Sequence, residues 1–307
     1  MTEYDIIVAG GGPAGLTAAI YCARAGKKVL VIEKMNPGGQ ITYAPLVENY
    51  PGLPGMSGAE YAEALVEQTI SFGVEFAYEE VMSVAPGNPI TIETDLEKRS
   101  CRAVILAIGT EHRHIGLENE EDLIGAGVSY CAVCDGAFYA GREVTVIGGG
   151  NSALQEALFL SEICSKVTLV NRREKLRADE CLVRKLKGRQ NVEFMYPYTV
   201  TKILEDDGEV NGLVLTNTET GQEEKLQTEG VFVAIGLKTC SEPFERLGIN
   251  NEAGYFLTDE HKQTAVPGIF AAGDCCDKKV RQLTTACGDG ATAAIAACEY
   301  IDNLEEK

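Results

Sequence analysis

The chain has 307 residues, of which 45% are hydrophobic and 24% charged, as in a folded globular protein with room for two domains. Its net charge of −19 argues against binding to a nucleic-acid backbone or to an anionic membrane surface, so we expect neither partner. The eleven cysteines form no spaced framework, and the amino-terminal segment lacks the features of a signal peptide. We therefore expect a cytoplasmic protein with most of its thiols free.

The amino-terminal segment predicts a β-α-β unit. The expected elements are a strand at 5–9, a helix at 16–25 and a second strand at 28–32. A glycine-rich turn of the form Gly-x-Gly-x-x-Gly occupies residues 10–15, between the first strand and the helix. This order is typical of a dinucleotide-binding fold.

The residue types in this turn suit a bound dinucleotide. Gly10 permits a tight turn, Gly12 lets the backbone approach a pyrophosphate, and Gly15 lets the helix pack closely on the strand. The helix amino terminus presents N–H groups to the phosphates. Glu33, directly after the second strand, can accept hydrogen bonds from an unphosphorylated adenosine ribose, as in FAD.

The same pattern returns 138 residues later, from Gly10 to Gly148. Strands are expected at 143–147 and 166–170, with a helix between them that runs to about residue 164. Three residues of the second turn stand at the offsets of the three glycines of the first: Gly148, Gly150 and Ala153. The repeat predicts a second nucleotide-binding unit.

The two units differ at the residue that follows the second strand. Asn171 stands where the first unit has Glu33, and it is followed by Arg172 and Arg173, with Arg177 a turn further on. A carboxylate would repel a 2′-phosphate, whereas arginines bind it through charge-assisted hydrogen bonds. The second unit is therefore predicted to bind NADPH.

Two short β-rich runs, 104–109 and 231–236, each close on a glycine. We expect them to be strands that return beneath the bound nucleotides.

Between the two nucleotide motifs lies the sequence Cys131-Ala132-Val133-Cys134-Asp135-Gly136. Half of a zinc site and a structural disulfide are the alternatives. Zinc would need two further ligands at suitable spacing, and so short a loop removes little entropy from the unfolded chain. A redox dithiol is favoured. Asp135 can exchange protons with a departing thiolate, or it can cap a turn.

Together these features resemble the low-molecular-weight, bacterial-type thioredoxin reductases of the class II pyridine nucleotide-disulfide oxidoreductases. Further matching segments include Gly38-Gly39-Gln40, Glu48-Asn49-Tyr50-Pro51-Gly52, Gly273-Asp274 and Arg281-Gln282. The resemblance implies an α/β fold with two Rossmann-like domains, the second inserted into the first. An FAD domain would cover 1–114 and 241–307, and an NADPH domain with the dithiol would cover 115–240.

The resemblance also implies roles for individual residues. We expect no metal site. Cys134 would face the flavin, Cys131 would attack the partner disulfide, and Asp135 would donate the proton. The implied FAD-binding residues are Gly10, Gly12, Pro13, Ala14, Gly15, Glu33, Gly39, Gln40, Asn49, Gly109, Gly273, Asp274, Arg281 and Gln282. The implied NADPH-binding residues are Gly148, Gly150, Asn151, Ser152, Ala153, Arg172, Arg173, Arg177, Ile235 and Gly236.

The implied function is a homodimeric thioredoxin-disulfide reductase that passes electrons from NADPH through FAD and the dithiol to a thioredoxin or thioredoxin-like protein. The sequence departs from the family pattern at Asn171, where histidine is usual, and at Lys238-Thr239-Cys240. A ferredoxin-fed thioredoxin reductase, an oxygen-dependent small-dithiol oxidase and a non-catalytic redox sensor remain as alternatives. The neighbouring Cys275 and Cys276 are expected to be packing residues, with an auxiliary redox role as the alternative.

Overall fold

The described part of the chain comprises residues 3–44, 46–53 and 55–305 of a computed structural model. The chain divides into two compact units, of which unit 1 consists of Met1–Glu111 and Lys238–Lys307, and unit 2 of His112–Leu237. Unit 2 is thus inserted into the sequence of unit 1. Two short strands at the junctions, β7 (Thr110–His112) and β16 (Leu237–Thr239), pair with each other.

Unit 1 is built on a seven-stranded sheet with the order β3-β2-β1-β6-β5-β4, in which β17 also pairs with β6. Its strands are β1 (Tyr4–Ala9), β2 (Val29–Ile32), β3 (Glu75–Ala77), β4 (Val81–Ala85), β5 (Ile90–Thr94), β6 (Lys98–Leu106) and β17 (Ile269–Ala271). The β1–β2, β1–β6, β2–β3 and β6–β17 pairs are parallel, whereas β5 pairs antiparallel with β4 and β6. The central parallel strands read as continuous apolar runs because both of their faces are covered.

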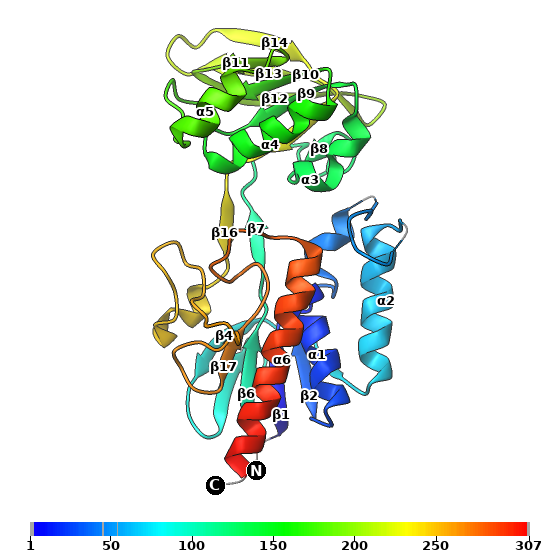
Figure 1. Ribbon diagram of the computed structural model, residues 1–307, viewed down its shortest axis with the longest axis vertical. Helices are drawn as coiled ribbons and strands as arrows, with labels where there is room; N and C mark the ends of the chain where they lie inside the picture. The colour runs from blue at the N-terminus through cyan, green and yellow to red at the C-terminus, as the bar shows by residue number, and fades with distance from the viewer. Residues whose placement is uncertain (1–2, 45, 54, 306–307) are drawn as a thin grey trace. The chain divides into compact units, whose positions relative to one another are not determined.

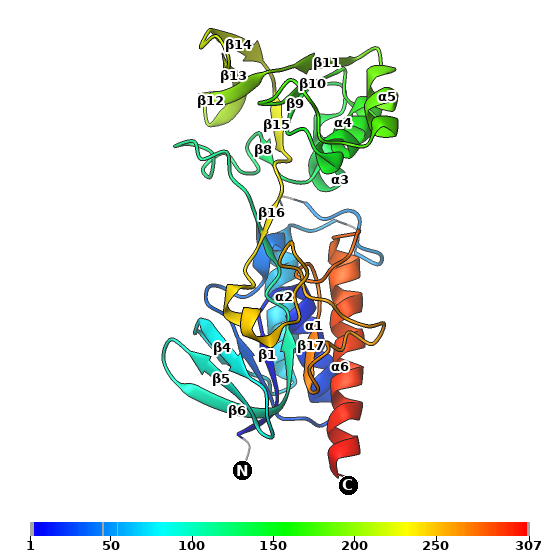
Figure 2. The ribbon, with the colours of Figure 1, turned by 90° about the vertical axis from the view of Figure 1, so that its left-hand side faces the viewer.

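Among the described residues of unit 1, three helices and two 3₁₀ turns accompany this sheet. They are α1 (Pro13–Arg24), α2 (Gly58–Ser71), α6 (Leu283–Glu305), η1 (Gly39–Tyr43) and η3 (Glu242–Leu247). Helices α1 and α6 lie side by side, as Figure 1 and Figure 2 both show. Their small residues allow this close approach, since a Cβ added at Gly290 would lie 2.1 Å from the carbonyl oxygen of Ala14. Within the described ranges, no helix is long and apolar enough to cross a bilayer.

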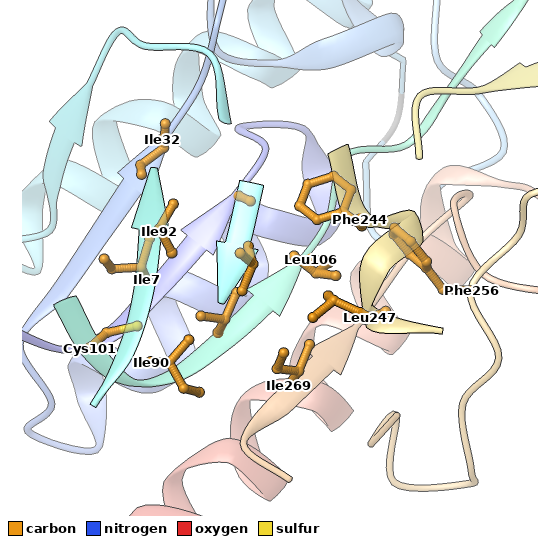
Figure 3. Close-up of a cluster of buried hydrophobic side chains, with 14 of the residues drawn as sticks. Ile7, Ile32, Ile90, Ile92, Cys101, Leu106, Phe244, Leu247, Phe256 and Ile269 are labelled. Atoms are coloured by element: carbon orange, nitrogen blue, oxygen red, sulfur yellow. The ribbon is translucent and has the colours of Figure 1, made fainter. Parts of the chain in front are cut away.

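Successive side chains of the unit 1 strands point to opposite faces of the sheet and form two apolar clusters. Ile7 and Leu106 belong to one cluster with Phe244 and Phe256 (Figure 3). The two phenylalanine rings pack edge to face, with 5.6 Å between their centroids. Val8 belongs to the other cluster, with alanines of α1 and α6. The sheet is therefore buried between the α1–α6 layer and the segments around η3.

Unit 2 has three layers. Its central sheet is parallel, with the order β11-β10-β9-β15-β8, and is made of β8 (Val128–Ser129), β9 (Glu143–Ile147), β10 (Lys166–Val170), β11 (Val192–Met195) and β15 (Gly230–Val233). One face packs against α3 (Ala132–Asp135), η2 (Gly136–Tyr139), α4 (Asn151–Ile163) and α5 (Glu180–Lys187). The other face packs against an antiparallel sheet of β12 (Tyr198–Asp206), β13 (Glu209–Asn217) and β14 (Glu223–Gln227).

The predicted fold class is confirmed, since both units contain parallel strands linked by helices. Three predicted boundaries are wrong: α1 begins at Pro13 rather than at residue 16, and β6 and β15 end at Leu106 and Val233 rather than at residues 109 and 236. Gly12 is the extended N-cap, and a proline in the first helical position loses no intrahelical hydrogen bond, so the helix starts directly after the turn.

Candidate active site

A disulfide joins Cys131 and Cys134 at the start of helix α3. Cys131 is the N-cap residue, and its sulfur accepts the backbone N–H of Cys134, with 3.2 Å between N and Sγ. Val133, between the two cysteines, is 52% exposed, so this loop reaches the surface of unit 2. The predicted disulfide is confirmed, and the other nine cysteines, all within the described residues, are free.

Asp135 lies one residue beyond the dithiol and is tied to it through Ser129, at the end of β8. The Ser129 hydroxyl donates to Asp135 Oδ2 at 2.6 Å and accepts the backbone N–H of Cys131 at 3.1 Å. Asp135 Oδ1 is buried and has no hydrogen-bond partner among the described residues. Burial raises the pKa of the Asp135 carboxyl, and the Ser129 hydrogen bond opposes the rise. The Asp135 carboxyl thus lies beside the dithiol with a raised pKa, and Ser129 is a neighbour that the motif alone did not indicate.

Tyr130 directly precedes the dithiol and anchors it to the first segment of unit 2. Its hydroxyl donates to Glu120 Oε1 at 2.7 Å and lies 3.0 Å from His114 Nδ1. Glu120 is buried, and its carboxylate accepts the backbone N–H groups of Ile115 and Gly116, both at 2.8 Å. No sequence motif indicated this cluster, because its members contact one another only through the fold.

The first glycine turn has the geometry that a dinucleotide needs. A Cβ on Gly10, whose φ is +107°, would lie 2.4 Å from the carbonyl oxygen of Ala107, and one on Gly15 would lie 1.9 Å from the carbonyl oxygen of Gly10. Gly12 is the N-cap of α1 and supplies no side-chain cap, so the first backbone N–H groups of that helix remain available for phosphate oxygens.

Glu33 is held against this turn. Its Oε2 accepts the backbone N–H of Gly11 at 2.7 Å, and its Oε1 accepts that of Met35 at 3.0 Å. Each carboxylate oxygen can accept more than one hydrogen bond, so both retain capacity for ribose hydroxyls. The arrangement fits the adenosine end of FAD.

Segments distant in sequence converge on the first turn of α1. A Cβ on Gly39 would lie 3.1 Å from the Cα of Gly12, and one on Gly273 would lie 2.8 Å from the Cβ of Ala14. Both glycines have positive φ, of +65° and +84°. The backbone therefore approaches this helix end from both sides, which forms a cradle around the expected pyrophosphate.

Asp274 supplies a buried acceptor next to this cradle. Its Oδ1 has no hydrogen-bond partner among the described residues, although the Lys278 ammonium lies 3.4 Å away. Burial raises the pKa of Asp274, and Lys278 opposes the rise. Lys278 also donates to Asp289, 2.9 Å away, and Asp289 Oδ2 accepts the backbone N–H of Gly273 at 3.3 Å. Apart from its ion pair with Lys278, Asp274 Oδ1 has capacity to accept a ligand hydroxyl, as on the FAD ribityl chain.

Other predicted FAD residues also meet. The Asn49 side-chain amide donates to Gln282 Oε1 at 3.3 Å, and the Gln40 amide donates to the carbonyl of Thr110. Thr110 follows Gly109, whose φ is +64°. The contacts of these residues with a flavin stay a prediction.

Arg281 is bound to its own loop. Its guanidinium donates to the carbonyl oxygens of Asp274 and Cys276, both at 3.2 Å, and lies 4.4 Å from the centre of the Tyr255 ring. These contacts fix the loop that leads into α6. The predicted position of Arg281 along the flavin ring stays a prediction.

The second glycine turn repeats the first. A Cβ on Gly148, whose φ is +149°, would lie 2.4 Å from the carbonyl oxygen of Ala234. The same distance separates a Cβ on Gly10 from the carbonyl oxygen of Ala107. Gly150 is the N-cap of α4, again without a side-chain cap. Asn171 is buried under the turn: a Cβ on Gly149 would lie 2.4 Å from its Oδ1. The Asn171 side chain therefore packs directly against the glycine turn.

The three arginines after β10 are exposed, and within the described ranges none of Arg172, Arg173 and Arg177 forms an ion pair with another residue. The backbone N–H of Arg177 donates to the carbonyl of Gly149 at 2.7 Å, which holds this loop beside the glycine turn. Guanidinium groups without an ion-pair partner can bind a phosphate, so their place next to a helix amino terminus suits a phosphorylated nucleotide.

The remaining predicted NADPH residues border the same helix end. Asn151 accepts the backbone N–H of Asp179 at 2.8 Å, and Ser152 is exposed, whereas Ala153 is buried in the core. Ile235 is 38% exposed, and Gly236 follows it with a φ of +107°. Their contacts with NADPH stay a prediction.

Cys275 and Cys276 are both buried in the core of unit 1. Cys275 Sγ donates to the carbonyl of Ala272 at 3.2 Å. The burial of both side chains agrees with the expected packing role, because a partner protein cannot reach them.

Comparison with known proteins supports the same assignment. The family model for pyridine nucleotide-disulphide oxidoreductases matches residues 4–290. The thioredoxin reductase of Bacillus subtilis (strain 168) is 45% identical over 304 residues, which cover 99% of this chain and 96% of that protein. The thioredoxin reductase of Treponema pallidum is 39% identical, with 99% of each chain covered. The crystal structure of thioredoxin reductase from Streptococcus pyogenes matches with a TM-score of 0.94 and 38% identity, covering 98% of both chains.

These findings confirm the predicted family and the predicted cofactors, FAD and NADPH, which members of this family use. The chain belongs to the pyridine nucleotide-disulphide oxidoreductase family.

Proposed function

We propose that the protein is an NADPH-dependent thioredoxin-disulfide reductase that works through FAD and the Cys131–Cys134 pair. The observation that carries the proposal is the disulfide at the start of α3, with the buried carboxyl of Asp135 beside it. The relatives that the chain matches over nearly its whole length are thioredoxin reductases.

The cofactor sites would be supplied by the two glycine turns. When bound, FAD would accept a hydride from NADPH and deliver the two electrons to the disulfide. The turn at residues 10–15, with Glu33 and Asp274, would hold FAD. The turn at 148–153 would hold the NADPH phosphates, and the exposed guanidinium groups of Arg172, Arg173 and Arg177 would select the 2′-phosphate.

The dithiol would then reduce the partner by thiol–disulfide exchange. Two electrons break the Cys131–Cys134 bond and leave two sulfur atoms to be protonated. The Cys131 thiolate attacks the partner disulfide, which forms a mixed disulfide and releases one partner thiolate. The Cys134 thiolate next attacks Cys131, restores the disulfide and releases the reduced partner. Asp135 would exchange the proton at the sulfur of Cys134.

We also infer a homodimer that acts in the cytoplasm. The family resemblance supports the dimer. The nine free cysteines, seven of them buried, are compatible with a reducing compartment, where disulfide bonds are rare.

The test is steady-state reduction of an oxidised bacterial thioredoxin, with NADPH and NADH compared as donors. We expect kcat/KM with NADPH to exceed that with NADH by roughly 100-fold, because the arginine contacts exist only for the phosphorylated nucleotide. In Cys134→Ser, NADPH should still bleach the flavin while thioredoxin reduction is lost. Equal use of both nucleotides, or turnover that survives in Cys134→Ser, would contradict the proposal.

A further inference from the structure

A largely buried ion-pair network in unit 1 joins helix α6 to the segments on either side of β17. Asp289 of α6 lies between two lysines, with its Oδ1 2.7 Å from the Lys262 ammonium and its Oδ2 2.9 Å from the Lys278 ammonium. The Lys278 ammonium also lies 3.4 Å from Oδ1 of Asp274. Lys278 thus faces two carboxyl groups, and its shorter contact is with Asp289.

The Asp289 carboxyl also binds the backbone of the predicted FAD site. Its Oδ2 accepts the N–H of Gly273, with 3.3 Å between the nitrogen and the oxygen. Gly273 lies against the first turn of α1, since a Cβ added to it would lie 2.8 Å from the Cβ of Ala14. Asp289 therefore anchors the residue directly before Asp274, in addition to holding the lysine that faces Asp274.

We propose that Asp289 is a positioning residue for FAD: it holds the Lys278 ammonium away from Asp274, so that Oδ1 of Asp274 stays available to a ribityl hydroxyl of the cofactor. This inference rests on the proposed role of Asp274 in FAD binding. It adds to that role a residue of α6 that acts through Lys278.

The charges of the network explain why Asp289 determines where the ammonium lies. Burial raises the pKa of Asp289, but the hydrogen bonds from Lys262 and Lys278 outweigh burial and bring this pKa below its ordinary value. Asp289 is therefore a carboxylate at neutral pH, and solvent screens its attraction for Lys278 only in part because both side chains are largely buried. Without this charge, the attraction of Asp274 would draw the ammonium onto Oδ1, and a donor of the protein would occupy the acceptor that the ribityl chain needs.

The test is the Kd of FAD for the full-length chain freed of its flavin, measured by flavin fluorescence in the wild type and in Asp289→Asn. The amide oxygen can still accept the Gly273 N–H, but the amide has no charge with which to hold Lys278. ADP, which has the adenosine and the pyrophosphate but no ribityl chain, is the second ligand, and its Kd is measured by calorimetry. Asp302→Asn is the matched control, because Asp302 also pairs with a lysine from α6 and its side chain is 60% exposed.

We expect Asp289→Asn to raise the Kd of FAD about 10-fold, the effect of losing one hydrogen bond to a charged group, and to leave the Kd of ADP within about twofold of the wild type. Asp302→Asn should change neither value. An unchanged Kd of FAD would overturn the proposal, and so would an equal rise for FAD and ADP, which is the result expected if Asp289 only supports the fold. Neither NADPH nor thioredoxin enters the measurement, so its failure is distinct from failure of the proposed function.

A second pair of variants keeps the inference testable if Asp289→Asn alone does not fold. Lys278→Met is compared with the double variant that carries Lys278→Met and Asp289→Asn, in which one charge of each sign is removed. With no ammonium left to hold, Asp289→Asn should change the Kd of FAD by less than about twofold in this background. A rise of about 10-fold there would overturn the proposal, because Asp289 would then act on FAD by a route other than Lys278.

Discussion

Asp135 lies directly after the dithiol, and one oxygen of its carboxyl is buried without a hydrogen-bond partner among the described residues. Its carboxyl accepts the Ser129 hydroxyl, and burial raises the pKa of this carboxyl above its usual value. We predict that Asp135→Asn slows thioredoxin reduction by roughly 100-fold, since the amide cannot exchange a proton with the sulfur. Reduction of the flavin by NADPH should be unchanged. Stopped-flow measurement of both half-reactions checks this, and an equal loss in both would contradict the role.

Ionisation of Glu156, on helix α4, should make the free energy of unfolding depend on pH. Its pKa rises from 4.5 to about 8 on folding, so the folded chain holds an extra proton between these values. The free energy of unfolding is highest below pH 4.5 and falls as pH rises to 8, by on the order of 5 kcal/mol in total. Glu156→Gln should lack this change and gain stability relative to the wild type between pH 5 and pH 9. Urea unfolding measures it, and a constant difference at all pH values would refute it.

The exposed arginines should act on one nucleotide only. We predict that Arg172→Ala raises the KM for NADPH roughly 10- to 100-fold, as expected for loss of one charged hydrogen bond, and leaves the KM for NADH unchanged. Lys175→Ala is the control, since Lys175 is exposed in the same loop. A similar rise for both nucleotides would show that Arg172 supports the loop rather than the 2′-phosphate.

At the scale of elements, the contact between α1 and α6 sets the position of the first glycine turn. Gly290 on α6 faces Ala14, where an added Cβ would lie 2.1 Å from a carbonyl oxygen, whereas Gly288 has open space. We predict that Gly290→Ala destabilises the protein by about 2–4 kcal/mol and weakens FAD retention, because the helices must separate. Gly288→Ala should be neutral or stabilise it by up to about 1 kcal/mol. Thermal unfolding and flavin content after dialysis test the pair, and identical behaviour would contradict this packing.

The sequence predicted the elements that carry motifs and left out those that do not. The glycine turns and the flanking apolar runs predicted β1, β2, β9 and β10 because a nucleotide fold constrains these residue types. The antiparallel sheet β12–β14 carries no such motif, and its strands are defined by packing against the parallel sheet of unit 2. Ser129 and Tyr130 were missed for the same reason, since only the fold brings them to their hydrogen-bond partners Asp135 and Glu120.

The whole molecule consists of two units with separate cores, and each carries one glycine turn. Unit 2 holds both the dithiol and the exposed arginines, and unit 1 holds Glu33 and Asp274. Reduction of a partner therefore needs both units, since neither contains the complete set of groups. The repeat at a fixed offset made this division predictable, whereas no motif could indicate how a partner protein binds.

The most direct measurement is an anaerobic titration of the oxidised, FAD-loaded protein with NADPH, followed by flavin absorbance and by thiol content. If electrons pass from NADPH through FAD to Cys131–Cys134, the wild type should take up about two equivalents of NADPH, one for the flavin and one for the disulfide. Cys134→Ser should take up about one. A wild-type protein that is fully reduced by about one equivalent, with the disulfide still intact, would contradict the account.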